Sequence, residues 1–391
     1  MPQALVDLAD WRYWLVTCLA AIVLSLAARA TTRKWFLAGF NLGFVGMLAG
    51  WRSGSLVCLC MLVVYFALVL IGRGRHPRVW LALASSALLL AFVFHKSPGL
   101  AIEAAPTLDL SLHRVSEILS IVGFSYVTLR AVDVMRSVYE KRHPPPDLPS
   151  TVNYLLPFHM LAAGPIQAYE DFTQPASGRD VSFFDYFVAV ERVAWGLFKK
   201  FVLAFAVYEL FLNDFESNGV YFWIEVQFFF LWLYLDFSAY SDIAVGVGQL
   251  IGVRTPENFD RPYLARNLVN FWERWHISLS LFIRRNIFYP IMLTAMRDTD
   301  GRRPLFSATL AYTVAFVLCG LWHALTINFL LWGCIHAVGL CTVTLYSHFL
   351  TRTLGSSGVK AYLANPLVRI VGIIVTYEFV ALSMLALFYP K

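Results

Sequence analysis

The sequence predicts an all-α integral membrane protein. Hydrophobic residues make up 59% of the 391 residues and charged residues only 14%, and the mean hydropathy is +0.63. A soluble domain of this length has too little interior to hide that much apolar surface. Several apolar runs also approach the roughly 20 residues that an α-helix needs to cross a bilayer. The strands of a membrane barrel are about half as long, so the run lengths favour helices.

Taken in chain order, the apolar stretches predict about nine to eleven membrane helices. The clearest runs are residues 15–28, 55–71, 79–94, 305–321, 329–346 and 367–388. Less uniform stretches are residues 35–49, 113–129, 153–167, 187–212 and 221–251. We expect the first run to remain as a membrane anchor, because Asp7 and Asp10 precede it and a basic cluster follows it. A cleaved secretory signal has the opposite arrangement of charges.

Clusters of arginine and lysine predict which loops face the cytoplasm. They lie at residues 29–34, 73–78 and 130–142, whereas Glu103 and Asp109 lie in a stretch expected on the other side. The net charge of +6 is therefore mostly a topology signal. Basic residues interleaved with aromatic ones in the manner of a nucleic-acid patch are not found, so we expect no nucleic-acid partner.

A proline-rich linker divides the chain. Residues 141–150 contain three adjacent prolines, 144–146, which exclude a helix there. We interpret residues 1–140 as N-terminal transmembrane helices that form a scaffold wall. Residues 151–350 are then the catalytic core, and residues 351–391 a C-terminal transmembrane helix of the same single membrane domain.

A second irregularity is expected just after this linker. Pro157 and Pro165 stand near the two ends of the short apolar stretch 156–166. Prolines interrupt helices, and non-helical backbone at membrane depth survives only where protein or a water-filled cavity covers it. We therefore predict a broken or re-entrant segment that lines a cavity.

Two histidines lie among residues that otherwise belong in the bilayer. His276 follows Phe-Trp-Glu-Arg-Trp in residues 271–275, and His323 ends the apolar run 311–322. An ionisable group at that depth is costly and usually faces a cavity or a substrate path, so both positions predict a reaction site. The alternative for His323 is a histidine that only forms a hydrogen bond in helix packing. His336 is interpreted as a packing residue, and His159 stays undecided.

The segment around His276 is expected to form one helix. On a continuous helix a single polar stripe would then contain Glu273, His276, Ser280 and Arg284. The alternative is an interfacial amphipathic helix whose histidine only reaches the lipid headgroups.

Polar residues also interrupt the hydrophobic stretch 234–246. They include Asp236, Ser238, Tyr240 and Asp242. Such a face either binds a polar substrate or holds neighbouring helices by hydrogen bonds, and the sequence supports both equally.

The charged loop 254–267 leads from that stretch to His276. Its Arg254, Arg261 and Arg266 are candidates for the phosphates of a cytoplasmic donor, although arginines beside membrane segments often only fix the topology.

No metal site or bound cofactor is predicted. His276 and His323 are far apart in the sequence and lack a partner at i+3 or i+4, unlike a zinc-binding helix. The six cysteines form no Cys-x-x-Cys pair and are expected to be small buried hydrophobes. A Gly-x-Ser-x-Gly nucleophile elbow is also missing.

Six segments in order resemble motifs of a known family. They are residues 125–134, 163–166, 235–242, 256–259, 271–276 and 320–323. Together they resemble the membrane-bound O-acyltransferases, in the bacterial branch with the alginate O-acetyltransferases and the teichoic acid D-alanyltransferases. The resemblance covers about two thirds of the sequence, and several motifs in the right order are specific.

The resemblance implies a ring of tilted helices around a central funnel, with re-entrant and amphipathic segments, in the bacterial cell (inner) membrane. His323 matches the family's active-site histidine, and His276 matches its second motif histidine. Further candidates for substrate binding are Asp236, Ser238, Tyr240, Asp242, Asn258, Arg261, Trp272, Glu273, Arg274, Trp275, Ser280 and Trp322.

The implied reaction transfers an acetyl or D-alanyl group from a cytoplasmic thioester donor, acyl-CoA or an acyl carrier protein, to a hydroxyl acceptor outside. The implied partners are this donor or carrier, an extracytoplasmic acceptor or second transferase, and membrane lipid. We expect His323 to act as general base, while His276 orients the acceptor or helps to stabilise developing charge.

The chain departs from the branch at a few positions. Arg284, Arg285 and Asn286 replace its acidic and tyrosine positions, and Ala324 stands where glycine commonly follows the histidine. A Gly-Gly-Asn-Arg element is also missing after Pro290. The modest length is closer to the D-alanyl type.

A rival hypothesis is a transporter or lipid flippase that uses the same histidines as a relay. It predicts paired broken helices in inverted repeats. The sequence shows one such segment, 156–166.

Overall fold

The structure is a computed structural model that describes residues 8, 10–26, 30–97, 123–174, 183–213 and 220–388. In these ranges every named element is a helix, which confirms the predicted all-α class. One isolated antiparallel bridge joins Phe259 and Trp275. Asp7, Arg29, Glu103 and Asp109 lie outside the described residues, as does the first part of the predicted stretch 113–129.

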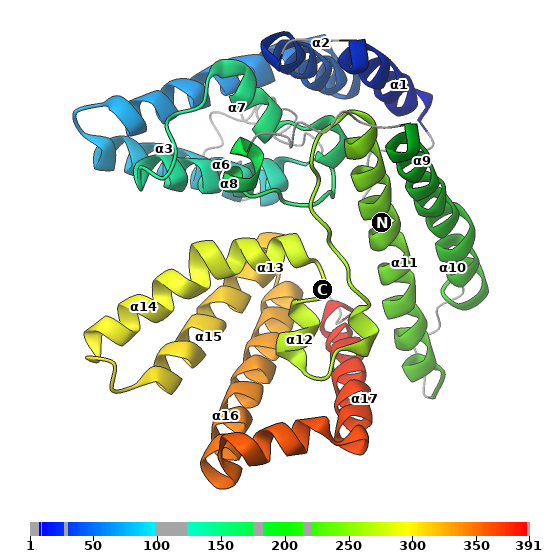
Figure 1. Cartoon of the computed structure of the whole chain (residues 1–391), viewed down its shortest axis with the longest axis vertical. Coiled ribbons are helices and arrows are strands. Elements are labelled where there is room, and N and C mark those ends of the chain that lie inside the picture. Colours follow the sequence, from blue (N-terminus) through cyan, green and yellow to red (C-terminus); the bar gives the residue numbers. More distant parts are fainter. Residues whose placement is uncertain are drawn as a thin grey trace. The chain divides into compact units, whose positions relative to one another are not determined.

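The helices follow one another as labelled in Figure 1. The first half of the chain contains α1 (Trp11–Leu26), α2 (Ala30–Arg73), α3 (Pro77–Lys96), α6 (Phe124–Tyr139), α7 (Leu148–Leu155), the 3-10 turn η2 (Phe158–Met160), α8 (Tyr169–Thr173), α9 (Phe183–Phe198), the π-helical turn η3 (Lys199–Ala204) and α10 (Phe205–Phe211). The second half contains α11 (Val220–Leu250), η4 (Pro262–Leu264), α12 (Leu268–Trp272), α13 (Ile277–Ile283), the π-helical turn η5 (Arg284–Phe288), α14 (Tyr289–Asp298), α15 (Pro304–His323), α16 (Ile327–Ala364), α17 (Pro366–Ser383) and α18 (Leu385–Phe388).

Five helices of the described residues are long and apolar enough to cross a membrane. They are Pro77–Lys96, Phe222–Leu250, Pro304–His323, Ile327–Ala364 and Pro366–Leu387. Four of them match a predicted apolar stretch to within two residues at each end, and Ile327–Ala364 contains the predicted stretch 329–346 and extends beyond it. In lipid the backbone polar groups must be satisfied within the segment, and a helix does this. The prediction of nine to eleven spans stays a prediction.

Helix α2 is two helices joined at a kink. Gly50 has φ 77° and ψ 163° inside it, a backbone conformation that glycine adopts without strain. The kink falls between the predicted stretches 35–49 and 55–71. The two expected segments are therefore two helices that point in different directions. Val57–Arg73 is itself a shorter apolar helix.

The chain forms two compact units. The first contains residues Met1–Leu197 and Tyr240–Pro256, and the second contains Phe198–Ala239 and Glu257–Lys391. The interpretation of residues 1–140 as wall, 151–350 as catalytic core and 351–391 as C-terminal helix stays a prediction.

The broken segment predicted at residues 156–166 is confirmed in the first unit. Helix α7 ends at Leu155, and only the short turn η2 follows. The fully buried Arg130 of α6 donates through Nη2 to the carbonyl oxygens of Met160, at 3.0 Å, and Pro165, at 3.2 Å. The guanidinium thereby satisfies carbonyls that the break in the helix leaves without helical partners.

His159 lies in this broken segment. It is buried, and its Nε2 lies 3.1 Å from Oγ1 of Thr255. The sequence left this histidine undecided, and the structure gives it a hydrogen-bonded place in the core of the first unit.

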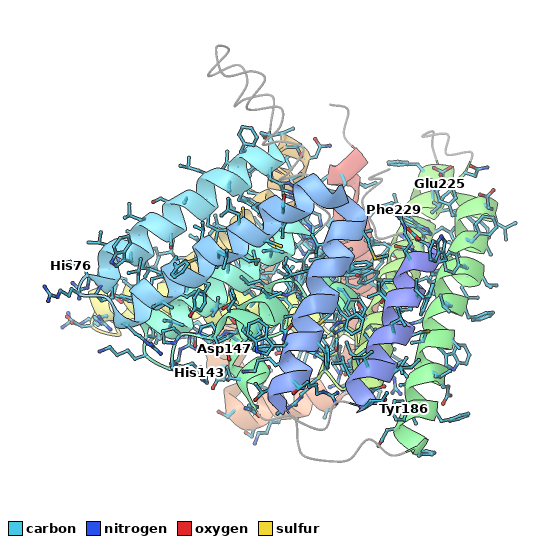
Figure 2. The ribbon with its side chains drawn as sticks, turned by 90° about the horizontal axis from the view of Figure 1, so that it is seen from above. His76, His143, Asp147, Tyr186, Glu225 and Phe229 are labelled. Carbon is cyan, nitrogen blue, oxygen red and sulfur yellow. The ribbon has the colours of Figure 1, made fainter. Side chains whose placement is uncertain are left out.

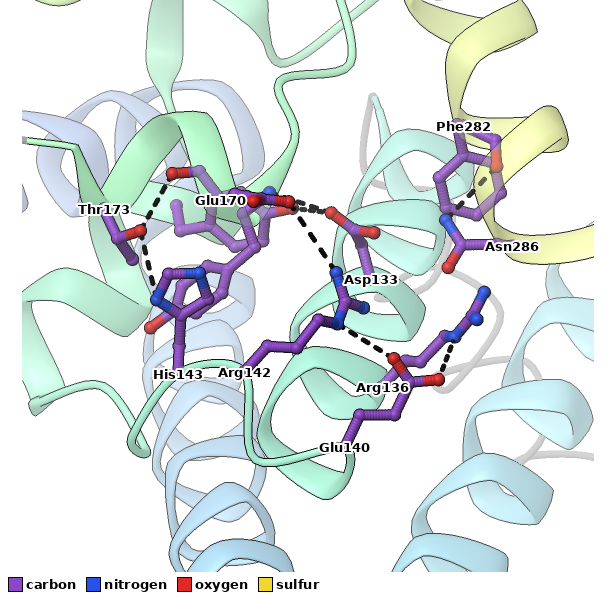
Figure 3. Close-up of polar contacts among 11 residues, drawn as sticks. Asp133, Arg136, Glu140, Arg142, His143, Glu170, Thr173, Phe282 and Asn286 are labelled. Atoms are coloured by element: carbon purple, nitrogen blue, oxygen red, sulfur yellow. Dashed lines mark hydrogen bonds and ion pairs between the residues drawn. The ribbon is translucent and has the colours of Figure 1, made fainter.

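The end of α6 and the proline-rich linker are joined by an ion-pair network (Figure 3). Glu140 accepts from Arg136 at 2.6 Å and from Arg142 at 2.9 Å. Farther along the linker, the side chain of Asp147 accepts from the Ser150 amide and caps α7. Figure 2 labels His143 and Asp147. The three prolines 144–146 are non-helical, as predicted.

Candidate active site

His276 lies at a break between two short helices in the second unit. Helix α12 ends at Trp272 and α13 begins at Ile277. The backbone of His276 is left-handed, with φ 43° and ψ 54°, which is uncommon for a residue other than glycine. The predicted single helix with one polar stripe is therefore wrong, and so is the alternative of one amphipathic interfacial helix.

The break has a physical cause in a distant part of the chain. The amide of Asp260 donates to the carbonyl of Arg274, and the amide of Ile277 donates to the carbonyl of Asn258, both at 3.0 Å. These bonds form the antiparallel bridge and take the backbone of residues 274–277 out of the helical pattern. Two members of the predicted stripe still meet, because Arg284 donates to Glu273 at 3.1 Å.

The side chain of Asn258 fixes the ring of His276. Its Oδ1 lies 3.3 Å from Nδ1 of His276 and accepts from the amide of Ser278 at 3.2 Å and from its hydroxyl at 2.6 Å. Because an amide N–H can only donate, Oδ1 is an acceptor, and Nδ1 of the neutral ring must carry the proton. Nε2 is then left with a lone pair. It is buried and has no hydrogen-bond partner among the described residues.

The ring of His276 is neutral at physiological pH. Burial, and then the charge of His323, lower the pKa of His276 to about 3. Phe237 covers it with an edge-to-face contact, at 4.7 Å between ring centroids and 89° between planes. The residue lies outside the five candidate spans, so its burial is provided by protein, and the charged imidazolium is disfavoured there.

His323 is the last residue of α15 and is partly buried. Its position is set by close packing of α15 on α16. A Cβ at Gly320 would stand 2.2 Å from the carbonyl oxygen of Phe329, and one at Gly333 would stand 2.5 Å from that of Phe316. Small residues are what allow helix backbones to approach so closely in membranes. The glycines therefore fix where α15 ends and where its terminal imidazole lies.

Aromatic rings surround His323. The centroids of Trp322, Phe329 and Trp332 lie 4.7, 5.6 and 5.6 Å from that of its imidazole. These contacts pack the imidazole of His323 among aromatic side chains.

Trp332 also connects His323 to a buried aromatic cluster. Its ring lies 4.6 Å from that of His336 and 6.0 Å from that of Trp272. His336 is fully buried and bonds through Nε2 to Ser383 at 3.0 Å, in agreement with its interpretation as a packing residue. Trp272 keeps its indole Nε1 buried with no hydrogen-bond partner in the part of the chain described.

A small pocket of about 40 Å³ opens beside this cluster. Its lining includes Trp272, Ser280, Arg284, Tyr312 and Phe316. Such a volume holds little more than a water molecule or two. Neither catalytic candidate lines it, so the pocket brings some predicted binding residues together at a place separate from both imidazoles.

The polar residues of α11 are paired with basic residues. In the second unit Lys199 donates to Ser238 at 3.1 Å, and Lys200 is ion-paired with Asp236. In the first unit Arg192 donates to Asp242 at 3.1 Å. These contacts are those expected of helix bridging, and a role in binding substrate stays a prediction for all three residues.

The remaining predicted residues lie in several environments. Tyr240 is buried in the first unit near the main chain of Ala162 and Ala163. Trp275 is buried and stacked on Phe271 at 5.6 Å. Arg274 donates to the carboxylate of Asp260 at 3.3 Å.

Arg261 is exposed and left-handed, with φ 48°, at the start of η4. The charged loop 254–267 predicted from the sequence is thus largely irregular backbone.

Sequence reasoning did not name three residues that shape this region. Ser278, Phe237 and Trp332 contact Asn258, His276 and His323 respectively. Phe237 lies inside the motif 235–242, and Ser278 lies two residues after the motif 271–276. The spacing of these two residues from other polar residues gave no signal. The only sequence signal for Trp332 is its position: it is an aromatic residue about one and a half turns into the helix that follows His323.

Within the described ranges, no three histidine, cysteine, aspartate or glutamate side chains are grouped so that they could hold a metal ion.

Comparison with known proteins places both histidines within a matched region. The sequence model of the membrane-bound O-acyltransferase family matches residues 78–385. The chain is similar to the teichoic acid D-alanyltransferase of Bacillus subtilis, with 26% identity over 282 residues, which is 68% of each chain. It is similar to the protein of that name from Streptococcus thermophilus, with 25% identity over 327 residues, 80% of this chain and 76% of the relative.

A further relative is the "probable alginate O-acetylase" of Azotobacter vinelandii. It is 30% identical over 237 residues, which are 58% of this chain and 45% of that protein. The present chain thus aligns with a larger share of the two D-alanyltransferases than of this alginate relative.

Proposed function

This chain belongs to the membrane-bound O-acyltransferase family, and from that premise we propose that it moves an acetyl or D-alanyl group from a cytoplasmic thioester to a hydroxyl outside the cell membrane. It is a multi-pass membrane enzyme of the O-acyltransferase class. The proposed donor is acyl-CoA or an acyl carrier protein. The proposed acceptor is a cell-surface polysaccharide, a teichoic acid or a secreted partner, which includes a second, extracytoplasmic transferase.

The proposed reaction uses His323 as general base. Its imidazole takes the proton of the acceptor hydroxyl while the hydroxyl oxygen attacks the thioester carbonyl carbon. A C–O bond forms, the C–S bond breaks, and the leaving thiolate takes the proton back from the imidazolium. The sulfur group departs as a thiol and His323 returns to its neutral form, so that protons and electrons balance. General-base catalysis of this kind typically contributes about a hundred- to ten-thousand-fold.

His276 has a narrower proposed role than the sequence suggested. With Nδ1 donating to Asn258, its free Nε2 can accept a hydrogen bond but cannot donate one. An acceptor fits a substrate hydroxyl, whereas a developing oxyanion needs a donor. We therefore assign His276 to orienting the acceptor hydroxyl and leave stabilisation of the oxyanion to other groups.

The observation that carries the proposal is the match over residues 78–385, which includes both histidines. The relatives that align over most of their length are named as teichoic acid D-alanyltransferases, which favours D-alanyl as the acyl group. No observation favours the transporter or flippase hypothesis.

The test is transfer of labelled acyl groups in proteoliposomes that contain the purified full-length protein. Labelled acetyl-CoA and a D-alanyl carrier protein are supplied on one side, and teichoic acid or alginate free of ester groups on the other. His323→Ala is expected to lower the transfer rate by at least about a hundredfold. His348→Ala is the matched control, because His348 is an exposed histidine on α16. Full activity of His323→Ala would contradict the proposed base, and uptake of substrate without acylation would support the transporter instead.

A further inference from the structure

A large groove in the second unit is lined by residues of α12, α16 and α17 and of the segment just before α12. These three helices are labelled in Figure 1. The volume of the groove is about 1070 Å³, at the upper end of the range for ligand-binding pockets, about 300–1,000 Å³. The groove does not include His276 or His323 in its lining. It is therefore distinct from both proposed catalytic imidazoles, although Glu273 and Arg274, two of the residues predicted to bind substrate, line it. Nothing in the inference below depends on the proposed acyl transfer.

The wall of the groove is made by two candidate membrane spans. Val343 and Leu350 of α16 and Leu367 and Val371 of α17 line it, and both helices are apolar enough to cross a bilayer. Apolar side chains on membrane-spanning helices are the natural contacts of acyl chains.

The floor of the groove is a bend in α16. Gly355 has φ 64° and ψ 173° inside this helix, and the residues after it form a short arm that leads to α17 (Figure 1). The hydroxyl groups of Tyr346 and Tyr362, one on each side of the bend, lie 2.8 Å apart. This hydrogen bond ties the arm to the main part of α16 and keeps the groove open between them.

Two arginines at the polar end of the groove are without partners. Arg266 and Arg369 both line it and are both exposed. Neither guanidinium has a hydrogen bond or an ion pair with another described residue, whereas Arg274 and Glu273, which also line the groove, are paired with Asp260 and Arg284.

The two arginines converge on one place. A Cβ at Gly372 would stand 2.6 Å from the carbonyl oxygen of Arg266, so α17 lies directly against the backbone of that residue. Arg369 precedes Gly372 by three residues and shares its helix face. A single anionic group can therefore reach both guanidinium ions.

The sequence places this end of the groove in the cytoplasmic leaflet. The last part of α16 carries Arg352 and Lys360, and the first turn of α17 carries Arg369. Residues 347–377 contain no aspartate or glutamate. Such an excess of positive charge marks the cytoplasmic side of a membrane protein. Basic pockets between transmembrane helices on that side bind the headgroups of anionic lipids.

We propose that this groove binds one anionic glycerophospholipid of the cytoplasmic leaflet, with its phosphate between Arg266 and Arg369 and an acyl chain along α16 and α17. Guanidinium forms charge-assisted, often bidentate hydrogen bonds to phosphate. The apolar wall would contact the acyl chain of the lipid. A free phosphate would leave this wall uncovered.

The test is native mass spectrometry of the full-length protein in a non-ionic detergent, titrated with phosphatidylglycerol or phosphatidylcholine. Phosphatidylglycerol should bind more tightly, and Arg266→Gln with Arg369→Gln should weaken its binding about 25-fold, at about fivefold for each arginine. Arg352→Gln removes the same charge from an exposed position outside the groove and should change the affinity less than twofold. Equal affinity for the two lipids, or an unchanged affinity in the double variant, would overturn the proposal.

A second pair of variants tests the apolar wall and keeps the proposal testable if the arginine variant does not fold. Val371→Trp should fill the groove and reduce phosphatidylglycerol binding at least about tenfold, as expected when a pocket loses its shape complementarity. Ile370→Trp places the same side chain on the neighbouring exposed position of α17 and should bind normally. If both tryptophan variants bind as the wild type does, the lipid does not occupy this groove.

Competition with coenzyme A tests whether the groove binds a lipid or a phosphate-bearing acyl donor. Coenzyme A should not displace phosphatidylglycerol from the wild-type protein. Displacement by coenzyme A that is lost when Arg266 and Arg369 are replaced would assign the groove to a donor and overturn the lipid assignment.

Discussion

The two histidines of the second unit are held in different ways. His276 is anchored by a hydrogen-bonded asparagine in a non-helical break, and it is buried. His323 ends a regular helix, is partly buried, and is surrounded by the rings of Trp322, Phe329 and Trp332. The hydrogen bond to Asn258 fixes the tautomer of His276, so its Nε2 is suited to accept a hydrogen bond. The imidazole of His323 is instead packed among aromatic rings at the end of a helix.

Replacing Asn258 should produce the largest effect and break the hydrogen-bonded half of this comparison. In Asn258→Leu, the donors on His276 and Ser278 lose their common acceptor. Each buried unpaired donor costs about 1–3 kcal/mol, so we expect a loss of about 3 kcal/mol or more in the free energy of unfolding. Thermal unfolding in detergent measures it. Asn258→Asp keeps an acceptor at this position and should be less damaging; equal damage from both variants would show that the acceptor is not what matters.

Replacing Gly320 tests whether the packing of α15 on α16 fixes the position of His323. In Gly320→Ala the new methyl group would stand 2.2 Å from the carbonyl oxygen of Phe329, and α15 and α16 must move apart. Overpacking of this kind costs typically about 1–3 kcal/mol, and the shift should lower acyl transfer by moving His323. Gly43→Ala is the control, because a Cβ there has nothing within 4 Å. Wild-type stability and transfer in Gly320→Ala would argue against fixation of His323 by helix packing.

A pH series sharpens the comparison with a smaller effect. The unfolded chain protonates His276 near the ordinary histidine pKa of about 6.5, whereas burial keeps its native pKa at about 3. The native state therefore binds fewer protons below pH 6.5, and stability is present above that value and lost as the pH falls towards 3. Between pH 7.5 and 5.5 the contribution of this residue is about 1.4 kcal/mol. The loss should be smaller in His276→Gln when unfolding is followed at both pH values, and an identical loss would mean that His276 is not the buried neutral group.

The spans were the part of the fold that the sequence predicted well. Helices α3, α15 and α17 coincide with runs of apolar residues. In lipid a spanning segment has to form all its backbone hydrogen bonds internally, as a helix does, so the length of the apolar run predicts the length of the helix. The kink at Gly50 and the break near Pro157 also carried local signals, a glycine and a proline.

The break at His276 could not be predicted in the same way. Residues 273–276 are Glu, Arg, Trp and His, and none of them interrupts a helix strongly. The cause is pairing with residues 258–260, a contact whose partners lie apart in the sequence. For the candidate site, the sequence therefore named Asn258 and His276 separately and had no means of joining them, and Ser278 was passed over because its role exists only once that pairing has formed.

The left-handed backbone of His276 has a consequence for how this enzyme can change. Glycine or asparagine would relax the main chain at this position, since both adopt positive φ with less strain than a branched or bulky residue, but either would remove the imidazole. Variants selected for heat resistance should therefore replace residue 276 with glycine or asparagine, whereas variants selected for turnover should keep histidine. This is expected where backbone strain is retained for function.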